Sequence, residues 1–225
     1  TSFNRPLDTW DVSKVTNIAG MFKSATNFNQ PLNSWDTSSL VTISTGTYAG
    51  AFYQANSFNQ SLDNWDVSKV TRFSYLFGYA TSFNQDISSW NTSSVTAMDS
   101  MFLAASSFNK PLESWDISNV TTLGNTFLAA TQFNQDLDDW NTNKVTNMAW
   151  MFQGATSFNQ DLSSWDVSSL VGAANMFSGA KLSTDNYDAL LIGWNTQTLK
   201  PNVTFFGGSS NYCNAAAARA NMIAS

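Results

Sequence analysis

The 225-residue chain is rich in aromatic and uncharged polar residues and poor in charge, with 43% hydrophobic, 14% aromatic and 12% charged residues. This content of Trp and Phe excludes a disordered chain, and the net charge of −6 argues against nucleic acid and anionic membrane as partners, because both need basic patches. The chain has no apolar stretch of 18 residues, so we expect no membrane insertion by this segment.

Residues 1–181 consist of seven copies of a unit that is normally 25 residues long. Each copy contains Phe-Asn, then Trp seven residues after that Phe, then a second Phe. Copy two has a five-residue insertion within residues 41–50. Because every copy rebuilds the same environment, we predict one continuous core of stacked aromatic columns. The Trp column contains Trp10, Trp35, Trp65, Trp90, Trp115, Trp140 and Trp165.

Within a copy, the pattern predicts one short strand followed by one short helix. The alternation over residues 10–12 is typical of a strand, and the steps of three and four along Val15, Ile18 and Phe22 favour a short helix or 3₁₀ segment. The apolar spacing from Leu7 to Ile18 matches the leucine-rich-repeat template, with Trp in a Leu position. We therefore predict an α/β fold, a leucine-rich-repeat-type solenoid with one strand and one helix per 25-residue coil.

Residues 182–225 break the period and are predicted to form a C-terminal capping segment of helix, strand and helix. Residues 183–185 resemble a helix N-cap, residues 203–206 a strand, and residues 215–223 a last helix. Such a cap hides the last apolar layer of an open array. The lone Cys213 is predicted to be a small buried thiol in the cap, and a reactive thiol is the alternative. Since Thr1 lies in the middle of a repeat phrase, we interpret the sequence as part of a longer chain.

Two polar positions recur through the copies. An Asn follows the first Phe of each copy. The favoured interpretation is a structural ladder in which these side-chain amides bridge successive coils. Its members are Asn4, Asn29, Asn59, Asn84, Asn109, Asn134 and Asn159. The position after each Trp holds Asp11, Asp36, Asp66, Asp116 and Asp166, with Asn in the two other copies. Local turn hydrogen bonds are the favoured interpretation of these carboxylates, and a row of Ca²⁺ sites is the alternative. We otherwise expect no cofactor.

No enzyme activity is expected. The chain contains no His, which removes the commonest general base and metal ligand, and it has no P-loop or dinucleotide motif. A glycosidase-type pair of carboxylates in the Asp row is the remaining catalytic alternative. Regular hydroxyl arrays can also match ice, but the outward positions mix Asp, Asn and Ser rather than holding a row of Thr.

Some positions change from copy to copy, and these should face outward because the fixed positions build the core. One such position holds Gly, Tyr, Ser, Asn or Trp, and a nearby one includes Tyr53. Exposed Tyr and Trp favour recognition of a partner. We therefore predict Tyr53, Tyr75 and Trp150 as binding residues. The alternative is that these side chains pack on neighbouring coils or on the inserted loop.

The phrases FNQPLNSWDTSSLVT, FNQDLSSWDVSSLV and NKVTNMAWMFQGATSFNQ resemble the BspA-like leucine-rich-repeat family of bacterial surface proteins, over about residues 1–180. The tail, NYDALLIGW followed by NYCNAAAARA, also resembles the end of such proteins. The resemblance implies an extracellular or bacterial cell-surface location, a role in adhesion and no catalysis. We thus expect a recognition module that binds a protein or glycan on another cell or surface. A purely structural spacer or assembly segment is the alternative.

Overall fold

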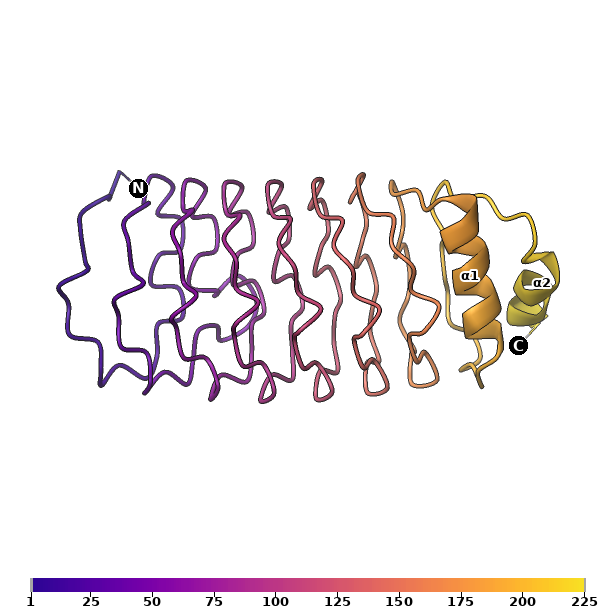
Figure 1. Ribbon diagram of the computed structural model, residues 1–225, viewed down its shortest axis with the longest axis horizontal. Helices are drawn as coiled ribbons and strands as arrows, with labels where there is room; N and C mark the ends of the chain where they lie inside the picture. The colour runs from indigo at the N-terminus through magenta and orange to yellow at the C-terminus, as the bar shows by residue number, and fades with distance from the viewer. Residues whose placement is uncertain (1, 225) are drawn as a thin grey trace.

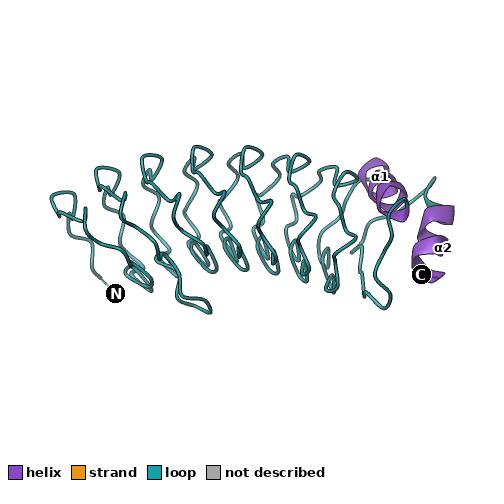
Figure 2. Ribbon diagram, turned by 90° about the horizontal axis from the view of Figure 1, so that it is seen from below, coloured by secondary structure: helices purple, strands orange, loops and turns teal. Residues whose placement is uncertain are grey.

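A computed structural model describes residues 2–224 and shows the chain wound into successive coils that stack along the long axis of the molecule (Figure 1). Within the described residues, the only helices are α1 (Thr184–Asn195) and α2 (Ala216–Ala224), and both lie at the C-terminal end (Figure 2). Residues 2–183 contain neither an α-helix nor an extended strand, so the coils consist of turns and isolated bridges.

Two columns of Phe rings form the centre of the core. The Phe residues of the Phe-Asn pairs lie 5.7–6.1 Å apart between successive coils, measured between ring centroids. The second Phe of each copy forms a parallel column with spacings of 5.2–5.8 Å. Nearly parallel rings of the two columns also contact each other, for example Phe127 and Phe133 at 3.9 Å. Except for Phe3, which is 41% exposed at the first coil, these large, offset rings fill the interior and exclude water from it.

The Trp side chains form a third column, which also joins the coils by hydrogen bonds. From Trp35 to Trp165 they are at most 4% exposed, and each indole Nε1–H donates to a Leu or Ile main-chain carbonyl of the preceding coil at 2.9–3.1 Å. The buried indole is thereby satisfied. The prediction of a buried side chain is wrong for Trp10, which is 52% exposed, because no coil of the described residues covers its outer side.

The predicted strand at residues 10–12 is wrong. Parallel bridges instead form seven residues after the Trp of a copy, as between Ala97 and Thr122. The chain turns directly after Trp10, because the Ser13 N–H donates to Asp11 Oδ1 at 3.1 Å and the Val15 N–H donates to the Val12 carbonyl at 2.8 Å. A backbone held in turns by such local bonds cannot pair as an extended strand.

The predicted helix in each coil is also wrong. In the third coil the Leu76 N–H closes a turn on the Phe73 carbonyl at 3.0 Å. The Tyr75 N–H instead donates to the Asp99 main-chain carbonyl of the next coil at 3.0 Å. Tyr75 and Tyr79 both have a φ of +59°. A residue at positive φ cannot continue a right-handed helix but fits the third position of a type II turn. Overlapping turns therefore replace the helix, and alternate N–H groups join the coils.

The recurring Asn side chains run as a hydrogen-bonded ladder along the array. Each Oδ1 accepts the backbone N–H of the Asn one coil further on, at 2.8–3.0 Å. In most coils the following Gln amide donates to the same oxygen. The ladder contains Asn4, Asn29, Asn59, Asn84, Asn109, Asn134 and Asn159.

Helix α1 takes the place of a further coil. The Ser183 N–H donates to Asn159 Oδ1 at 2.7 Å, which extends the Asn ladder, and Trp194 Nε1 donates to the Leu162 carbonyl at 3.0 Å, as in the repeats. The strand predicted for residues 203–206 is reduced to one bridged residue, Phe205, paired with Ala173. That pairing ends because the segment leaves the coil at a turn, in which the Ser210 N–H donates to the Gly207 carbonyl at 3.3 Å.

Asp188 of α1 anchors the start of α2. The residue is 5% exposed, and its carboxylate accepts the backbone N–H groups of Cys213, Asn214 and Ala215 at 2.9, 2.7 and 3.1 Å. These bonds lower the pKa of Asp188, the bond from Asn214 most strongly. Cys213 is exposed, so the prediction of a buried thiol is wrong. The reason is that its backbone, rather than its side chain, is held against Asp188.

Candidate functional site

The insertion in copy two folds into a small loop against the third coil. An antiparallel bridge joins Ser44 to Gly50, and the Ala51 N–H donates to the Ile43 carbonyl at 3.0 Å. Any side chain at Gly50 would overlap the Tyr75 backbone. Glycine therefore permits the close approach of the loop to the next coil.

The loop completes a cluster of four tyrosines, Tyr48, Tyr53, Tyr75 and Tyr79, which we call the tyrosine cluster. The Tyr48 ring centroid lies 5.0 Å from that of Tyr75 and 5.5 Å from that of Tyr53, and Tyr53 lies 5.9 Å from Tyr75 and 5.7 Å from Tyr79. The rings meet edge-on or tilted, a favourable geometry for aromatic pairs. Tyr48 is 50% and Tyr79 39% exposed, so the cluster is open to solvent at these two residues.

Tyr53 is the buried centre of this cluster, not an exposed contact residue as predicted. It is 6% exposed because the other tyrosines enclose it. Gly78 also leaves room for its ring, since a Cβ at position 78 would lie only 3.0 Å from Tyr53 Cδ2. Burial raises the pKa of the Tyr53 hydroxyl, and Tyr79, Tyr48 and Tyr75 raise it further. Tyr53 therefore supports the rings that face solvent.

Trp150 occupies the position of Tyr75 three coils further along, and its side chain is 40% exposed. At the coil spacing of a parallel ladder the two positions lie roughly 15 Å apart. Both residues have positive φ, +59° at Tyr75 and +57° at Trp150, which costs a bulky L-residue about 1 kcal/mol or more. The equivalent residues of four other coils are smaller and suit this backbone better, namely Gly20, Ser100, Asn125 and Asn175.

We refer to Tyr48, Tyr75, Tyr79 and Trp150 together as the aromatic face. The sequence pattern identified the positions of Tyr75 and Trp150 but missed those of Tyr48 and Tyr79. Tyr48 lies in the insertion, which has no equivalent in other copies, and Tyr79 shares its position with Ala104 and Ala129, which carry no aromatic signal. The positive φ that these positions share is not visible in the repeat alone.

The row of aspartates makes local hydrogen bonds. The backbone N–H two residues later donates to Oδ1 of Asp36, Asp66, Asp116 and Asp166 at 2.9–3.0 Å, as it does to Asp11. Hydrogen bonds from the serine hydroxyls are the main cause of a lowered pKa at Asp11, Asp36, Asp66 and Asp116. Between residues 2 and 224, no three carboxylate or thiol groups gather to hold a metal ion. The Ca²⁺ alternative stays a prediction.

An exposed row of threonines, which the sequence analysis missed, runs beside the bridged positions. The hydroxyls of Thr96, Thr121 and Thr146 each donate to the threonine carbonyl of the preceding coil at 3.1–3.2 Å. The row is one residue wide, because the bridged positions next to it hold Arg72, Ala97, Thr122 and Asn147. It therefore lacks the second rank of hydroxyls that a flat lattice-matching surface needs.

Comparison with known proteins places the chain in a repeat family. A family model described as "Mycoplasma protein of unknown function, DUF285" matches residues 1–50, 42–127 and 110–218. No curated protein and no solved structure matches the chain. Neither helix of the described chain is long and apolar enough to cross a membrane. Since the matched segments overlap and include both the coils and most of the cap, the chain belongs to the DUF285 family.

Proposed function

We propose that the stacked coils are a leucine-rich-repeat-type solenoid of a BspA-like bacterial surface protein, and that this segment is a non-catalytic recognition module of an adhesin. In this proposal the chain is extracellular and binds a protein or glycan on another cell or surface, without a cofactor. The match of a repeat family along most of the chain supports the architecture, and the absence of His from the sequence supports a role without acid–base catalysis.

The observation that carries the binding role is the placement of aromatic residues where the backbone disfavours them. Stability alone would favour Gly or Asn at positive φ, as in the coils with Gly20, Asn125 and Asn175. Tyr75 and Trp150 instead place large rings there. Tyr75 is half-buried against Tyr48 and Tyr53, and Trp150 is 40% exposed. Exposed Tyr and Trp contribute large contact area at low entropic cost, which is why they predominate in binding sites.

The aromatic face favours an extended ligand. The tyrosine cluster and Trp150 lie roughly 15 Å apart by coil spacing, and the intervening coils carry the smaller Ser100 and Asn125. A polysaccharide chain or an extended peptide can contact both groups of rings at once, and occupancy of both raises affinity beyond that of either one.

The test is binding of the chain to a glycan array and to immobilised cell-surface proteins, with Trp150→Asn and Tyr48→Ala as variants. Trp150→Asn is chosen because the same position holds Asn125 and Asn175, so the fold is retained. We expect each variant to bind about tenfold more weakly, which corresponds to the loss of a moderately important contact residue. The control is Ile192→Ala, which removes a 47% exposed apolar side chain on α1, away from the aromatic face.

Equal binding by the variants and the unmodified chain would contradict a role for the aromatic face. No binding by any of these proteins, together with end-to-end association in sedimentation, would instead support the spacer or assembly role. Thermal unfolding of each variant is recorded in parallel, so that a loss of binding is not confused with a loss of fold.

A further inference from the structure

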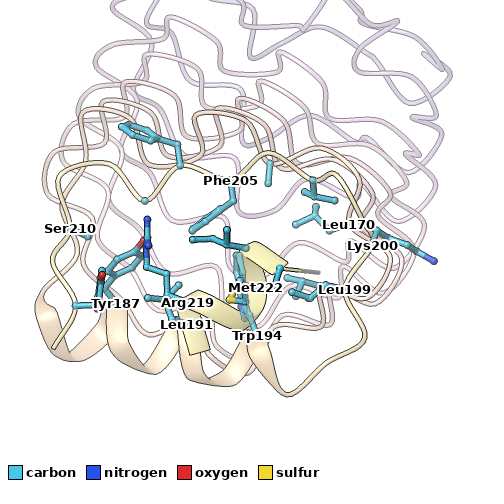
Figure 3. A pocket seen from close by; sticks show the side chains of 18 of the residues that line it. Leu170, Tyr187, Leu191, Trp194, Leu199, Lys200, Phe205, Ser210, Arg219 and Met222 are labelled. Carbon is cyan, nitrogen blue, oxygen red and sulfur yellow. The ribbon is translucent and has the colours of Figure 1, made fainter. Parts of the chain in front are cut away.

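The cap forms a cavity of about 640 Å³ that is open to solvent on one side and separate from the aromatic face (Figure 3). It lies between the last coil, α1, the segment around Phe205 and α2. This volume falls within the range of small-molecule sites in proteins, roughly 300–1,000 Å³. A segment whose only task was to cover the last coil would have no need of a cavity of this size.

The middle of the cavity is apolar. Leu191 and Trp194 of α1 form one side, Leu170 of the last coil another, and Phe205 and Met222 project between them (Figure 3). Leu191 and Trp194 are 1% and 2% exposed, and the Phe205 ring contacts the Trp194 ring at 5.4 Å between centroids. These side chains are held by the core and give the cavity fixed walls, which suit an aliphatic chain.

Among the lining residues that the structure describes, the charged side chains are both positive. They are Arg219 and Lys200, and none of these described lining residues is an Asp or Glu. Arg219 lies near Tyr187 and Ser210 on one side, and Lys200 lies on the opposite side (Figure 3). Because the whole chain has a net charge of −6, a pair of cations without a carboxylate is a local exception that favours an anionic group.

Tyr187 supplies a hydroxyl beside Arg219. The residue is 7% exposed and lines the cavity. Gly207 leaves space for this hydroxyl, since a side chain there would overlap Tyr187 Oη. Burial raises the pKa of Tyr187, so the hydroxyl stays protonated at neutral pH and can donate. Arg219 is exposed, and its guanidinium lies over the Tyr212 ring, 5.4 Å from the ring centroid.

We propose that this cavity binds a free aliphatic carboxylate, with the alkyl chain against Trp194, Leu191 and Phe205 and the carboxylate at Arg219 and Tyr187. The guanidinium and the phenol both donate to the carboxylate oxygens, and a charge-assisted bond of this kind fixes the orientation of the ligand. The site is independent of the proposed adhesin role, because none of its residues belongs to the aromatic face.

The test is isothermal titration of the chain with decanoate below its micellar concentration. We expect saturable binding of one decanoate per chain. The affinity for decanoate should be about tenfold lower for Arg219→Gln. It should be unchanged for the charge-matched control Lys14→Gln, which removes an exposed cation of the first coil. Decyltrimethylammonium, which has the same tail and the opposite charge, should not bind.

A second variant, Val203→Trp, fills the cavity from its wall and should abolish binding while the thermal unfolding of the coils is retained. Absence of decanoate binding to the unmodified chain would overturn the proposal. Equal binding of decanoate and decyltrimethylammonium, or full binding by Arg219→Gln, would overturn it as well, because the charge of the site would then have no role.

Discussion

Individual side chains form hydrogen bonds that join neighbouring coils. These bonds lie in a water-free interior, where an unpaired polar group would destabilise the fold. Trp115 is 3% exposed, stacks on Trp90 at 6.3 Å and donates from Nε1 to the Ile87 carbonyl at 3.1 Å. The Trp115 ring therefore fills space in the core and also provides the hydrogen-bond donor for the Ile87 carbonyl. Packing and hydrogen bonding thus depend on the same side chain.

We expect Trp115→Ala to lower the free energy of unfolding by about 3–5 kcal/mol, the usual cost of a large cavity in a well-packed core. Trp115→Phe keeps an aromatic ring but loses the hydrogen bond, so its cost should be clearly smaller. Equilibrium unfolding in guanidinium chloride measures both values. A loss below about 1 kcal/mol for the Ala variant would show that the ring is not part of a packed interior.

At Asp116 the carboxylate accepts the Ser118 N–H at 2.9 Å, and the Ser118 hydroxyl is the main cause of its lowered pKa. A lowered pKa in the folded state means that the interaction stabilises the fold above the unfolded value near 3.8 and is lost as the pH falls through the folded value. The turn formed by this residue should therefore weaken only in acid.

We expect Asp116→Ala to cost about 0.5–1 kcal/mol at pH 7, a small value because the carboxylate is exposed. Asp116→Asn should cost less, since Asn91 and Asn141 make the same turn in other coils, with the Ser93 N–H 3.2 Å from Asn91 Oδ1. The difference in stability between the Asn variant and the unmodified chain should shrink below pH 4. If the Asn variant were as unstable as the Ala variant, the turn would depend on charge rather than on an acceptor oxygen.

At the scale of the elements, the sequence predicts the apolar columns better than the secondary structure. Residues that recur every 25 positions must have equivalent surroundings, so the Phe and Trp columns follow from spacing alone. The steps of three and four along Val15, Ile18 and Phe22 suit overlapping β-turns as well as a helix, because both repeat about every three residues. Only the backbone conformation distinguishes overlapping turns from a helix. Tyr and Trp rarely adopt positive φ, so their presence in the sequence does not indicate that conformation.

The candidate site could be predicted only in part, for a related reason. The variability of their position predicts that Tyr75 and Trp150 face outward; Trp150 is exposed and Tyr75 is half-buried. Tyr53 shares that kind of variability but is covered by Tyr48 from the insertion, and the path of an insertion cannot be read from the repeat. The cavity in the cap likewise depends on the angles at which α1 and α2 meet the last coil.

Helix α2 depends on one carboxylate of α1. Isolated helices of nine residues are marginal, and within α2 only Ala218 is buried, so the three N–H groups bound by Asp188 are a main source of its order. We expect Asp188→Ala to increase hydrogen exchange at residues 213–218 at least tenfold and to leave the coils protected. Asp185→Ala, on the exposed first turn of α1, is the matched control. Unchanged exchange in the Asp188 variant would mean that packing alone positions α2.

For the whole molecule, contacts link each coil chiefly to its two neighbours, as in other arrays of stacked repeats. Removing one complete copy should then rejoin every ladder in register. Deletion of residues 109–133 connects Phe108 to Asn134 and leaves Trp140 to donate to the Ile87 carbonyl in place of Trp115. We expect this variant to fold, with a denaturant m value lower by about a tenth, in proportion to chain length. Deletion of residues 109–128, which is out of phase, should prevent cooperative unfolding.

The in-phase deletion also separates the two proposed binding sites. It brings Trp150 one coil nearer to the tyrosine cluster, a change of about 5 Å, and leaves every residue of the cap cavity in place. A ligand that contacts both ends of the aromatic face must then adopt another geometry, so we expect its affinity to fall at least severalfold, with decanoate binding unchanged. Unaltered binding on the aromatic face would mean that the ligand contacts Trp150 or the tyrosines, but not both, since an extended ligand held at two points depends on the distance between them.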